Sequence, residues 1–243
     1  METGEKRIGE NLGEVRERIR RACERSGRRP EEVTLIAVSK TKPFEDIAAA
    51  WKAGTAQFGE NYVQEMTRKM DLADAGEMAG KIRWHMIGHL QKNKVKYLMG
   101  RTALIHSVDS VSLAEQIERE AARRDWTARL LLEVNIAGEE TKWGFDAAGA
   151  GAAAAEMLKM PHVRVLGLMT SAPATEDPET NRLWFRQLHA LGLEMAGKGL
   201  LCLTDPEFPG PVLSMGMTGD FEVAVEEGAT MVRVGTAIFG GRS

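Results

Sequence analysis

The chain has 243 residues, of which 43% are hydrophobic, and its 32 basic and 35 acidic side chains give a formal net charge of −3. This length suits one large domain, and the slightly acidic balance argues against a nucleic-acid-binding protein, which is more often basic. No stretch approaches the roughly 18 consecutive apolar residues of a membrane span, and the N-terminus lacks the apolar segment of a signal peptide. The two cysteines, Cys23 and Cys202, lie far apart, so we expect no disulfide and a cytoplasmic protein.

The first 25 residues carry apolar side chains at a helical spacing. Gly27 and Pro30 follow, and both residue types are common just beyond a helix end. The segment therefore predicts an amphipathic helix whose buried face is formed by Ile8, Leu12, Val15, Ile19 and Ala22.

From residue 34 onwards, short apolar runs alternate with helical patterns. The predicted strands are Thr34–Ser39, Ala56–Gly59, Arg83–Gly88, Leu104–Val108, Arg129–Asn135, Val163–Met169, Val212–Met215 and Met231–Val234. The predicted helices are Phe44–Ala53, Val63–Met70, Lys92–Leu98, Ser112–Arg123, Ala147–Lys159, Glu179–Gly197 and Asp220–Glu227. This alternation indicates parallel strands, and eight units in this length predict one α/β domain over residues 1–243, a (β/α)8 TIM-type barrel with an extra N-terminal helix. An open, doubly wound sheet is the alternative, and we expect the proline-rich segment 202–213 to be a surface loop.

A lysine ends the first predicted strand, in the sequence TLIAVSKTKP. In a (β/α)8 barrel the functional groups gather at the carboxyl ends of the strands, so Lys40 would lie at the barrel mouth. Partial desolvation would lower the pKa of its amine, and a neutral amine can attack an aldehyde. On this segment alone, a lysine that extends into solvent is the simpler interpretation. Lys42 and Lys142 are further candidate amines, with ordinary surface roles as the alternative.

Hydroxyl and glycine residues follow the last two predicted strands. Ser214 and Thr218 flank the sequence MGM, and Gly235 and Thr236 stand where a short helix would begin. Glycine allows close backbone approach and helix N-terminal amides favour anions, and the loops after strands seven and eight commonly bind phosphate in barrel enzymes. Ordinary glycine turns are the alternative for each loop alone. Together with Lys40, the two loops favour a phosphorylated aldehyde, a description that pyridoxal 5′-phosphate (PLP) fits.

Two histidines are spaced as a metal-binding pair would be on one helix. His85 and His89 are four residues apart, but they straddle the end of a predicted strand. No carboxylate at a suitable spacing completes a zinc site. We therefore expect structural packing for this pair and no metal site.

Seven segments in order resemble one family over nearly the whole chain. They are AVSKTKP, FGENYVQE, WHMIGHLQKNK, HSVDS, NIAGEETKWGF, GLMTSAP and LSMGMTGDFEVAVEEGATMVRVGTAIFG. The chain resembles the pyridoxal phosphate homeostasis proteins, which are PLP-binding barrels related to the N-terminal domain of alanine racemase. Each segment is weak by itself, and their common order makes the resemblance specific. Thr218 stands where many relatives have serine, which also carries a hydroxyl.

The resemblance implies a role for each candidate residue. Lys40 would hold PLP as a Schiff base, Arg233 would approach the pyridine nitrogen, and Asn61 would lie near the phenolic oxygen of the ring. The phosphate would be held by Ser214, Thr218, Gly235 and Thr236. Because an arginine side chain has no acceptor, Arg233 would keep the pyridine nitrogen unprotonated, and the ring would be a weak electron sink. The alternative for Arg233 is a salt bridge inside the barrel.

The resemblance also bears on the choice between an enzyme and a carrier. A racemase needs a second acid or base opposite the lysine, and in alanine racemase this group is a tyrosine from a second β domain that we expect this chain to lack. Tyr62 and Tyr97 are the two tyrosines, and neither is a convincing second base. We therefore expect a monomeric PLP homeostasis protein without catalytic residues, with apo PLP-dependent enzymes as its partners. A weak amino-acid racemase or another PLP-dependent enzyme is the alternative.

Overall fold

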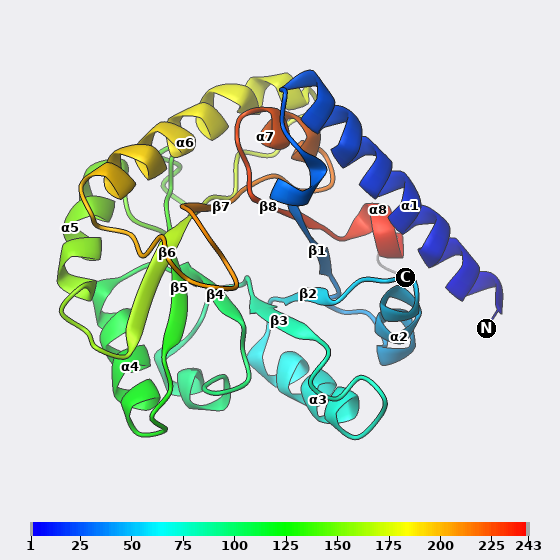
Figure 1. The fold of residues 1–243 in the computed structure, drawn as a ribbon, viewed down its shortest axis with the longest axis horizontal. Coiled ribbons are helices and arrows are strands. Elements are labelled where there is room, and N and C mark those ends of the chain that lie inside the picture. Colours follow the sequence, from blue (N-terminus) through cyan, green and yellow to red (C-terminus); the bar gives the residue numbers. More distant parts are fainter. Residues whose placement is uncertain (1, 242–243) are drawn as a thin grey trace.

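Eight parallel strands form a closed barrel in a computed structural model, which describes residues 2–241 (Figure 1). Each strand pairs with the next in chain order, and β1 also pairs with β8, which closes the barrel. The predicted (β/α)8 barrel is therefore confirmed, and the open sheet is excluded. The strands are β1 (Thr34–Val38), β2 (Gln57–Glu60), β3 (Arg83–Met86), β4 (Leu104–Val108), β5 (Ala128–Glu133), β6 (Val163–Met169), β7 (Val212–Ser214) and β8 (Met231–Val234).

Helices surround the barrel on its outer side (Figure 1). The α-helices are α1 (Glu2–Arg25), α2 (Phe44–Lys52), α3 (Val63–Asp74), α4 (Val111–Ala122), α5 (Ala147–Met157), α6 (Arg182–Gly197), α7 (Phe221–Glu226) and α8 (Thr236–Phe239). Three shorter 3₁₀ helices are η1 (Pro30–Glu32), η2 (Lys92–Tyr97) and η3 (Pro178–Asn181). The element expected at Lys92–Leu98 is thus a 3₁₀ helix over Lys92–Tyr97, and Val95 is the one buried residue in that span, so little apolar surface supports a longer helix.

The N-terminal helix packs along one side of the barrel. All five residues of its predicted apolar face are buried, and the helix contacts α2, α7 and α8 (Figure 1). Gly27 follows the helix with a φ of 68°, a left-handed conformation that glycine adopts without steric cost. The predicted helix and its end are confirmed.

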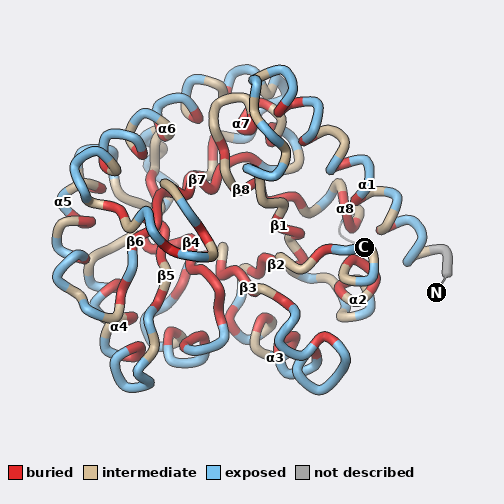
Figure 2. The backbone as a smooth tube through the Cα atoms, in the orientation of Figure 1, coloured by how far each residue is buried: buried red, intermediate tan, exposed pale blue. Residues whose placement is uncertain are grey.

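The apolar core has two layers, and the buried residues in Figure 2 lie along the strands and the inward sides of the helices. A large outer cluster fills the space between the barrel wall and the helices. A smaller inner cluster fills the barrel and includes Ile36, Leu104, Leu131, Leu166 and Met231. Strands buried on both faces need no alternation of apolar and polar residues, which explains the continuous apolar run in β5.

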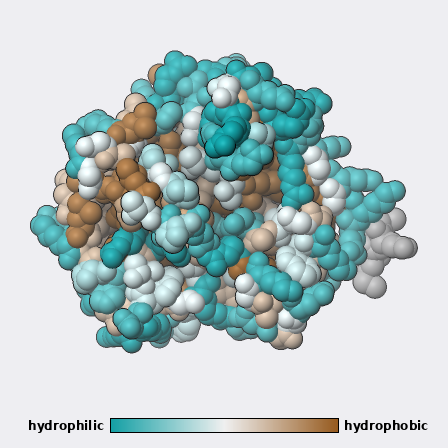
Figure 3. All heavy atoms as spheres, in the orientation of Figure 1, coloured by the Kyte–Doolittle hydropathy of each residue, from teal (hydrophilic) through white to brown (hydrophobic). Residues whose placement is uncertain are grey.

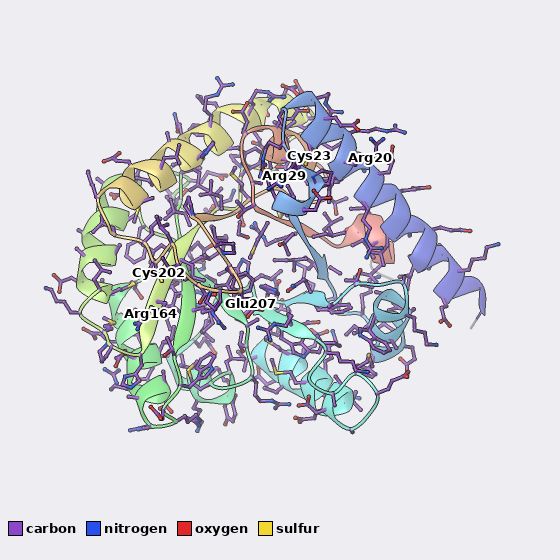
Figure 4. The ribbon with its side chains drawn as sticks, in the orientation of Figure 1. Arg20, Cys23, Arg29, Arg164, Cys202 and Glu207 are labelled. Atoms are coloured by element: carbon purple, nitrogen blue, oxygen red, sulfur yellow. The ribbon has the colours of Figure 1, made fainter. Side chains whose placement is uncertain are left out.

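The proline-rich segment between α6 and β7 closes one end of the barrel. Phe208 is 5% exposed and belongs to the inner cluster, and Glu207 pairs with Arg83 and lies 3.5 Å from Arg129. The segment crosses in front of the barrel in Figure 1, and Glu207 lies near the start of β3 in Figure 4. The segment is an irregular loop with exposed residues such as Leu203 and Pro209, as expected, but the Phe208 side chain anchors it in the interior, which the sequence did not indicate. We call residues 205–210 the plug.

The surface is largely hydrophilic, with apolar groups gathered over the α5–α6 side of the face in Figure 3. Leu158 at the end of α5 and Leu193 on α6 are each more than half exposed. Cys23 and Cys202 are both free thiols on opposite sides of the barrel (Figure 4), as expected. Within residues 2–241, the helices are all too short or too polar to cross a membrane.

Candidate functional site

Lys40 lies in a tight turn directly after β1. The preceding residue, Ser39, is buried, and its amide donates to the Gly59 carbonyl at 3.0 Å. Thr41 has a φ of 62°, and the Lys42 amide returns to the Ser39 carbonyl at 3.0 Å. The turn therefore fixes the backbone of Lys40 at the carboxyl end of the strand, and Lys40 itself is half-buried.

Lys69, a buried lysine on α3, binds the backbone of this turn. Lys69 Nζ lies 2.7 Å from each of three oxygens: the Ser39 carbonyl, Glu60 Oε1 and Glu65 Oε1. Glu60 Oε1 also accepts from Ser39 Oγ at 2.6 Å, and Glu65 Oε1 accepts from the Thr41 amide at 2.6 Å. The two carboxylates and one ammonium thus tie β1, β2 and α3 together on both sides of Lys40.

Burial dominates the electrostatics of this cluster. It raises the pKa of Glu60, and the Lys69 charge and the hydrogen bonds from Lys69 and Ser39 oppose that shift. Within residues 2–241, Glu60 Oε2 is buried without a hydrogen-bond partner. Glu60 and Lys69 were not among the residues expected from the sequence. The Glu65–Lys69 spacing of four residues on a predicted helix was the available signal.

Lys42 has a structural contact of its own. Its Nζ donates to the carbonyl oxygens of Phe239 and Gly241, at 3.2 and 2.8 Å. Lys42 therefore links the turn after β1 to the end of α8. Lys142 Nζ donates to the Ser171 carbonyl at 3.1 Å and pairs with Glu139, so both alternative lysines have partners in the fold.

The loops after β7 and β8 meet beside the turn of Lys40. Gly235 N lies 3.4 Å from Thr218 Oγ1, and Thr236 is the first residue of the short helix α8, as expected. Because β1 pairs with β8, Ala37 is level with Val234. A Cβ atom on Gly235 would lie 3.2 Å from the Val38 carbonyl oxygen, so only a glycine allows this close approach comfortably.

Arg233 is a buried cation inside the barrel. It is 5% exposed, and its Nη1 donates to the carbonyl and hydroxyl oxygens of Ser214, each at 2.8 Å. Its Nη2 donates to the Thr170 carbonyl at 2.9 Å and lies 3.4 Å from Ser171 Oγ. Burial lowers the pKa of Arg233 to about 10, against the effect of Glu133 and Asp220, so the side chain stays charged at neutral pH. All four acceptors are neutral, which disfavours the salt-bridge alternative.

Ser214 is fully buried next to this guanidinium. Its hydroxyl lies 2.8 Å from Arg233 Nη1 and 2.9 Å from His106 Nδ1. The phosphate role expected for Ser214 stays a prediction. In the structure its hydroxyl contacts the arginine.

Asn61 follows β2, the neighbour of β1 on the side away from β8. A Cβ atom on Gly88 would lie 2.4 Å from the Asn61 carbonyl oxygen, so the backbones after β2 and β3 touch here. Asn61 lines a cavity of about 390 Å³ together with Tyr62, His89 and Lys94. Tyr62 is 59% exposed, so its ring extends into solvent and does not pack into the helix.

His85 and His89 do not face each other, and each makes separate packing contacts. His85 is buried inside the barrel, and its Nδ1 lies 2.9 Å from His106 Nε2. His89 pairs with Asp109 at 3.1 Å and stacks on Trp143 with ring centroids 4.4 Å apart. Among residues 2–241, no group of three potential metal ligands comes together. The packing expected of His85 is confirmed.

Glu133 is a further titratable group that the sequence analysis missed. It ends β5, and burial raises the pKa of its carboxyl to about 7, with the Asp109 charge acting in the same direction and Arg233 opposing it. The available signal was its position at the end of the apolar strand RLLLE.

Comparisons with known proteins agree on one family. The alanine racemase N-terminal domain family matches residues 11–243. The pyridoxal phosphate homeostasis protein of Aquifex aeolicus is 45% identical over 234 residues, which cover 96% of this chain and 97% of that protein. The homologue of the same name in Escherichia coli is 38% identical over 235 residues, with 97% of each chain covered.

Solved structures give the same result. PipY of Synechococcus elongatus, in a structure with PLP bound, superimposes with a TM-score of 0.80 at 34% identity, and the match covers 96% of this chain and all of PipY. Alanine racemase of Clostridium difficile shares the fold at a TM-score of 0.73 and 14% identity, over 98% of this chain and 60% of the racemase. The chain therefore belongs to the pyridoxal phosphate homeostasis protein family, whose barrel is that of the alanine racemase N-terminal domain.

Proposed function

We propose that the protein holds PLP at the mouth of the barrel, through a covalent bond between Lys40 and the cofactor aldehyde, and serves PLP homeostasis. The observation that carries this proposal is that the carboxyl ends of β1 and β8 lie side by side. The β1–β8 register brings the turn of Lys40 beside Gly235 and Thr236. PLP supplies an aldehyde for an amine and a phosphate for hydroxyl and amide donors, and both kinds of partner are present.

The donors at this mouth fit such a cofactor. Thr218, Gly235 and Thr236 would bind the phosphate, because their hydroxyl and backbone N–H groups lie on adjoining loops. The Arg233 guanidinium would donate to the pyridine nitrogen. Asn61 would lie near the phenolic oxygen, and Ser214 would hold Arg233 in place through its hydroxyl and carbonyl oxygens.

We propose a holder of PLP and not a catalyst. The matched relatives are named as homeostasis proteins, and PipY has been solved with PLP. Tyr62 and Tyr97, the candidate second bases, are 59% and 49% exposed, and a second base needs a fixed position over the substrate. A monomeric state and delivery of PLP to apo-enzymes are parts of the proposal that rest on the family resemblance, and a cytoplasmic location is a part that rests on the two unpaired cysteines.

Borohydride trapping tests the proposed attachment. The purified protein is incubated with PLP, reduced with borohydride, digested and mapped by mass spectrometry. We expect a visible absorbance band that disappears on reduction and a pyridoxyl label on Lys40. The matched control is Lys42→Ala, which removes an amine two residues away and should leave the label on Lys40. A wild-type protein that takes up no PLP, or a label confined to other lysines, would contradict the proposal.

A further inference from the structure

A row of hydrogen bonds crosses the barrel interior from Arg233 to the far side. Arg233 Nη1 lies 2.8 Å from Ser214 Oγ, which lies 2.9 Å from His106 Nδ1. His106 Nε2 lies 2.9 Å from His85 Nδ1, and His85 Nε2 lies 2.7 Å from Gln57 Oε1. The five side chains come from β8, β7, β4, β3 and β2. The closed barrel is therefore what brings them into one row.

The chemistry of the two ends fixes the direction of every bond in the row. A guanidinium only donates, so Ser214 Oγ accepts from Arg233. At the other end the Gln57 amide oxygen only accepts, so His85 Nε2 carries a proton and donates to it, and a neutral His85 accepts at Nδ1 from His106 Nε2. A neutral His106 is then left with an acceptor at Nδ1, to which Ser214 Oγ donates its proton. Both imidazoles are thus expected as Nε2–H tautomers.

The surroundings of the row keep both imidazoles neutral. His85 and His106 are fully buried, and burial is the main cause that lowers the pKa of His85 to about 3 and that of His106 well below its usual value. The charges near them are also cationic: Arg83 on β3 and Arg233 on β8. A second proton on either ring would therefore face both desolvation and repulsion.

The plug covers the end of the row that lies opposite Arg233. The Phe208 ring packs edge-on to His85, with centroids 6.2 Å apart and planes at 69°. Glu207 in the same segment pairs with Arg83 and lies 3.5 Å from Arg129, so two arginines at the barrel end balance the charge of its carboxylate. Cooperative hydrogen-bond chains are strongest where water is kept out.

We propose that His106 and His85 are positioning residues for Arg233, which they hold in one orientation as a donor to the ring nitrogen of PLP. This inference rests on the proposed function, because it assigns the interior row a role in PLP binding. With its proton donated to His106, the Ser214 hydroxyl is fixed in the rotamer that turns its oxygen lone pairs toward Arg233. Loss of the His106 acceptor would free the Ser214 hydroxyl to turn and would loosen the guanidinium.

Nitrogen NMR of the protein without PLP tests the row itself. In protein with ¹⁵N-labelled histidine, we expect His85 and His106 to be neutral Nε2–H tautomers at pH 7. Nδ1–H tautomers, or a protonated ring at either position, would overturn the inference. The measurement involves no cofactor, so its outcome is independent of whether PLP binds.

Two substitutions at one position test the link to the cofactor. His106→Leu removes the acceptor, whereas His106→Asn can place an amide oxygen near the former Nδ1. We expect PLP to dissociate on the order of tenfold faster from the leucine variant, with a shifted visible band, because one buried hydrogen bond is lost. The asparagine variant should keep the wild-type band and a dissociation rate within about twofold, since rescue requires only the acceptor.

A histidine outside the row provides the matched control. His189 lies on α6 outside the barrel, and His189→Leu should leave the band and the dissociation rate unchanged. A leucine variant at His106 that matches wild type in band and rate would overturn the inference while PLP binding to Lys40 stands. An equal increase in the PLP dissociation rate in the leucine and asparagine variants would overturn the inference as well, because the hydrogen-bond acceptor at His106 would then not determine that rate. If the variants fail to fold, the NMR measurement on the wild-type protein still tests the row, and a wrong tautomer there overturns the inference.

Discussion

At the scale of the residue, the turn of Lys40 depends on Lys69, which lies outside the segment AVSKTKP that contains Lys40. Lys69 is 5% exposed and reaches the Ser39 carbonyl and both carboxylates of its cluster. An ammonium buried between two carboxylates is held by their charge, and its removal leaves Glu60 desolvated without a counter-ion. The local chain around Lys40 is therefore stabilised by long-range electrostatics.

Substitution of this lysine has a defined expected cost. We expect Lys69→Met to lower the free energy of unfolding by about 3 kcal/mol, because it leaves a buried carboxyl unpaired. The matched double variant, Lys69→Met with Glu60→Gln, should recover part of that loss, since the remaining amide carries no charge. Urea unfolding measures both. A single variant as stable as wild type would show that the ion pair does not support the turn.

At the scale of the element, the plug shows how a loop can act as part of the core. Asp205 Oδ1 accepts from the amides of Glu207 and Phe208, at 3.0 and 3.1 Å, and Asp205 Oδ2 accepts from Arg129 Nε at 2.7 Å. These bonds shape the segment so that the Phe208 ring enters the barrel. The prolines of this segment indicated an irregular chain, and they carried no information about its burial.

Truncation of the anchoring ring tests the role of the plug. We expect Phe208→Ala to destabilise the protein by about 3 kcal/mol, because it removes a buried aromatic group and leaves a cavity in the inner cluster. Pro209→Ala changes the exposed neighbouring residue and should cost less than about 1 kcal/mol. Thermal and urea unfolding of the two variants give the comparison. Similar costs for both would mean that Phe208 does not anchor the segment.

At the scale of the whole molecule, buried titratable groups give stability two opposing dependences on pH. His85 and His106 remain neutral when folded and accept protons when unfolded, so they reduce the free energy of unfolding as the pH falls below about 6.5. Glu133 acts in the opposite sense. Its carboxyl keeps a proton up to about pH 7 in the folded protein but loses it near pH 4.5 when unfolded, so it reduces the free energy of unfolding as the pH rises between these values.

A neutral substitution at Glu133 isolates its contribution. We expect Glu133→Gln to raise the free energy of unfolding by up to about 3 kcal/mol at pH 8, since the amide cannot ionise. At pH 4 the variant and the wild type should be equally stable, because the carboxyl is then protonated in both states. Urea unfolding at pH 4, 6 and 8 measures the difference. A difference that is constant across this range would contradict the assignment.

The sequence by itself determined the barrel and most of its elements. Local patterns encode these features: the apolar face of α1, the strand–helix alternation, and the chemically distinctive residues after β1, β7 and β8. Lys40, Arg233 and Gly235 could be singled out because amine, guanidinium and glycine have few substitutes in such positions. The family resemblance then gave each of them an expected role.

Only the tertiary structure decided which residues meet. The burial of the plug and the row from Arg233 to Gln57 join side chains that are far apart in the chain, and Lys69 reaches the Ser39 carbonyl 30 residues away. Their contacts depend on barrel closure and strand register, which bring His106 of β4 to Ser214 of β7 across the interior and Lys69 of α3 to the turn after β1. A histidine in an apolar strand has the same local signature whether it fills space or belongs to a hydrogen-bonded row. The three-dimensional neighbours alone distinguish the two.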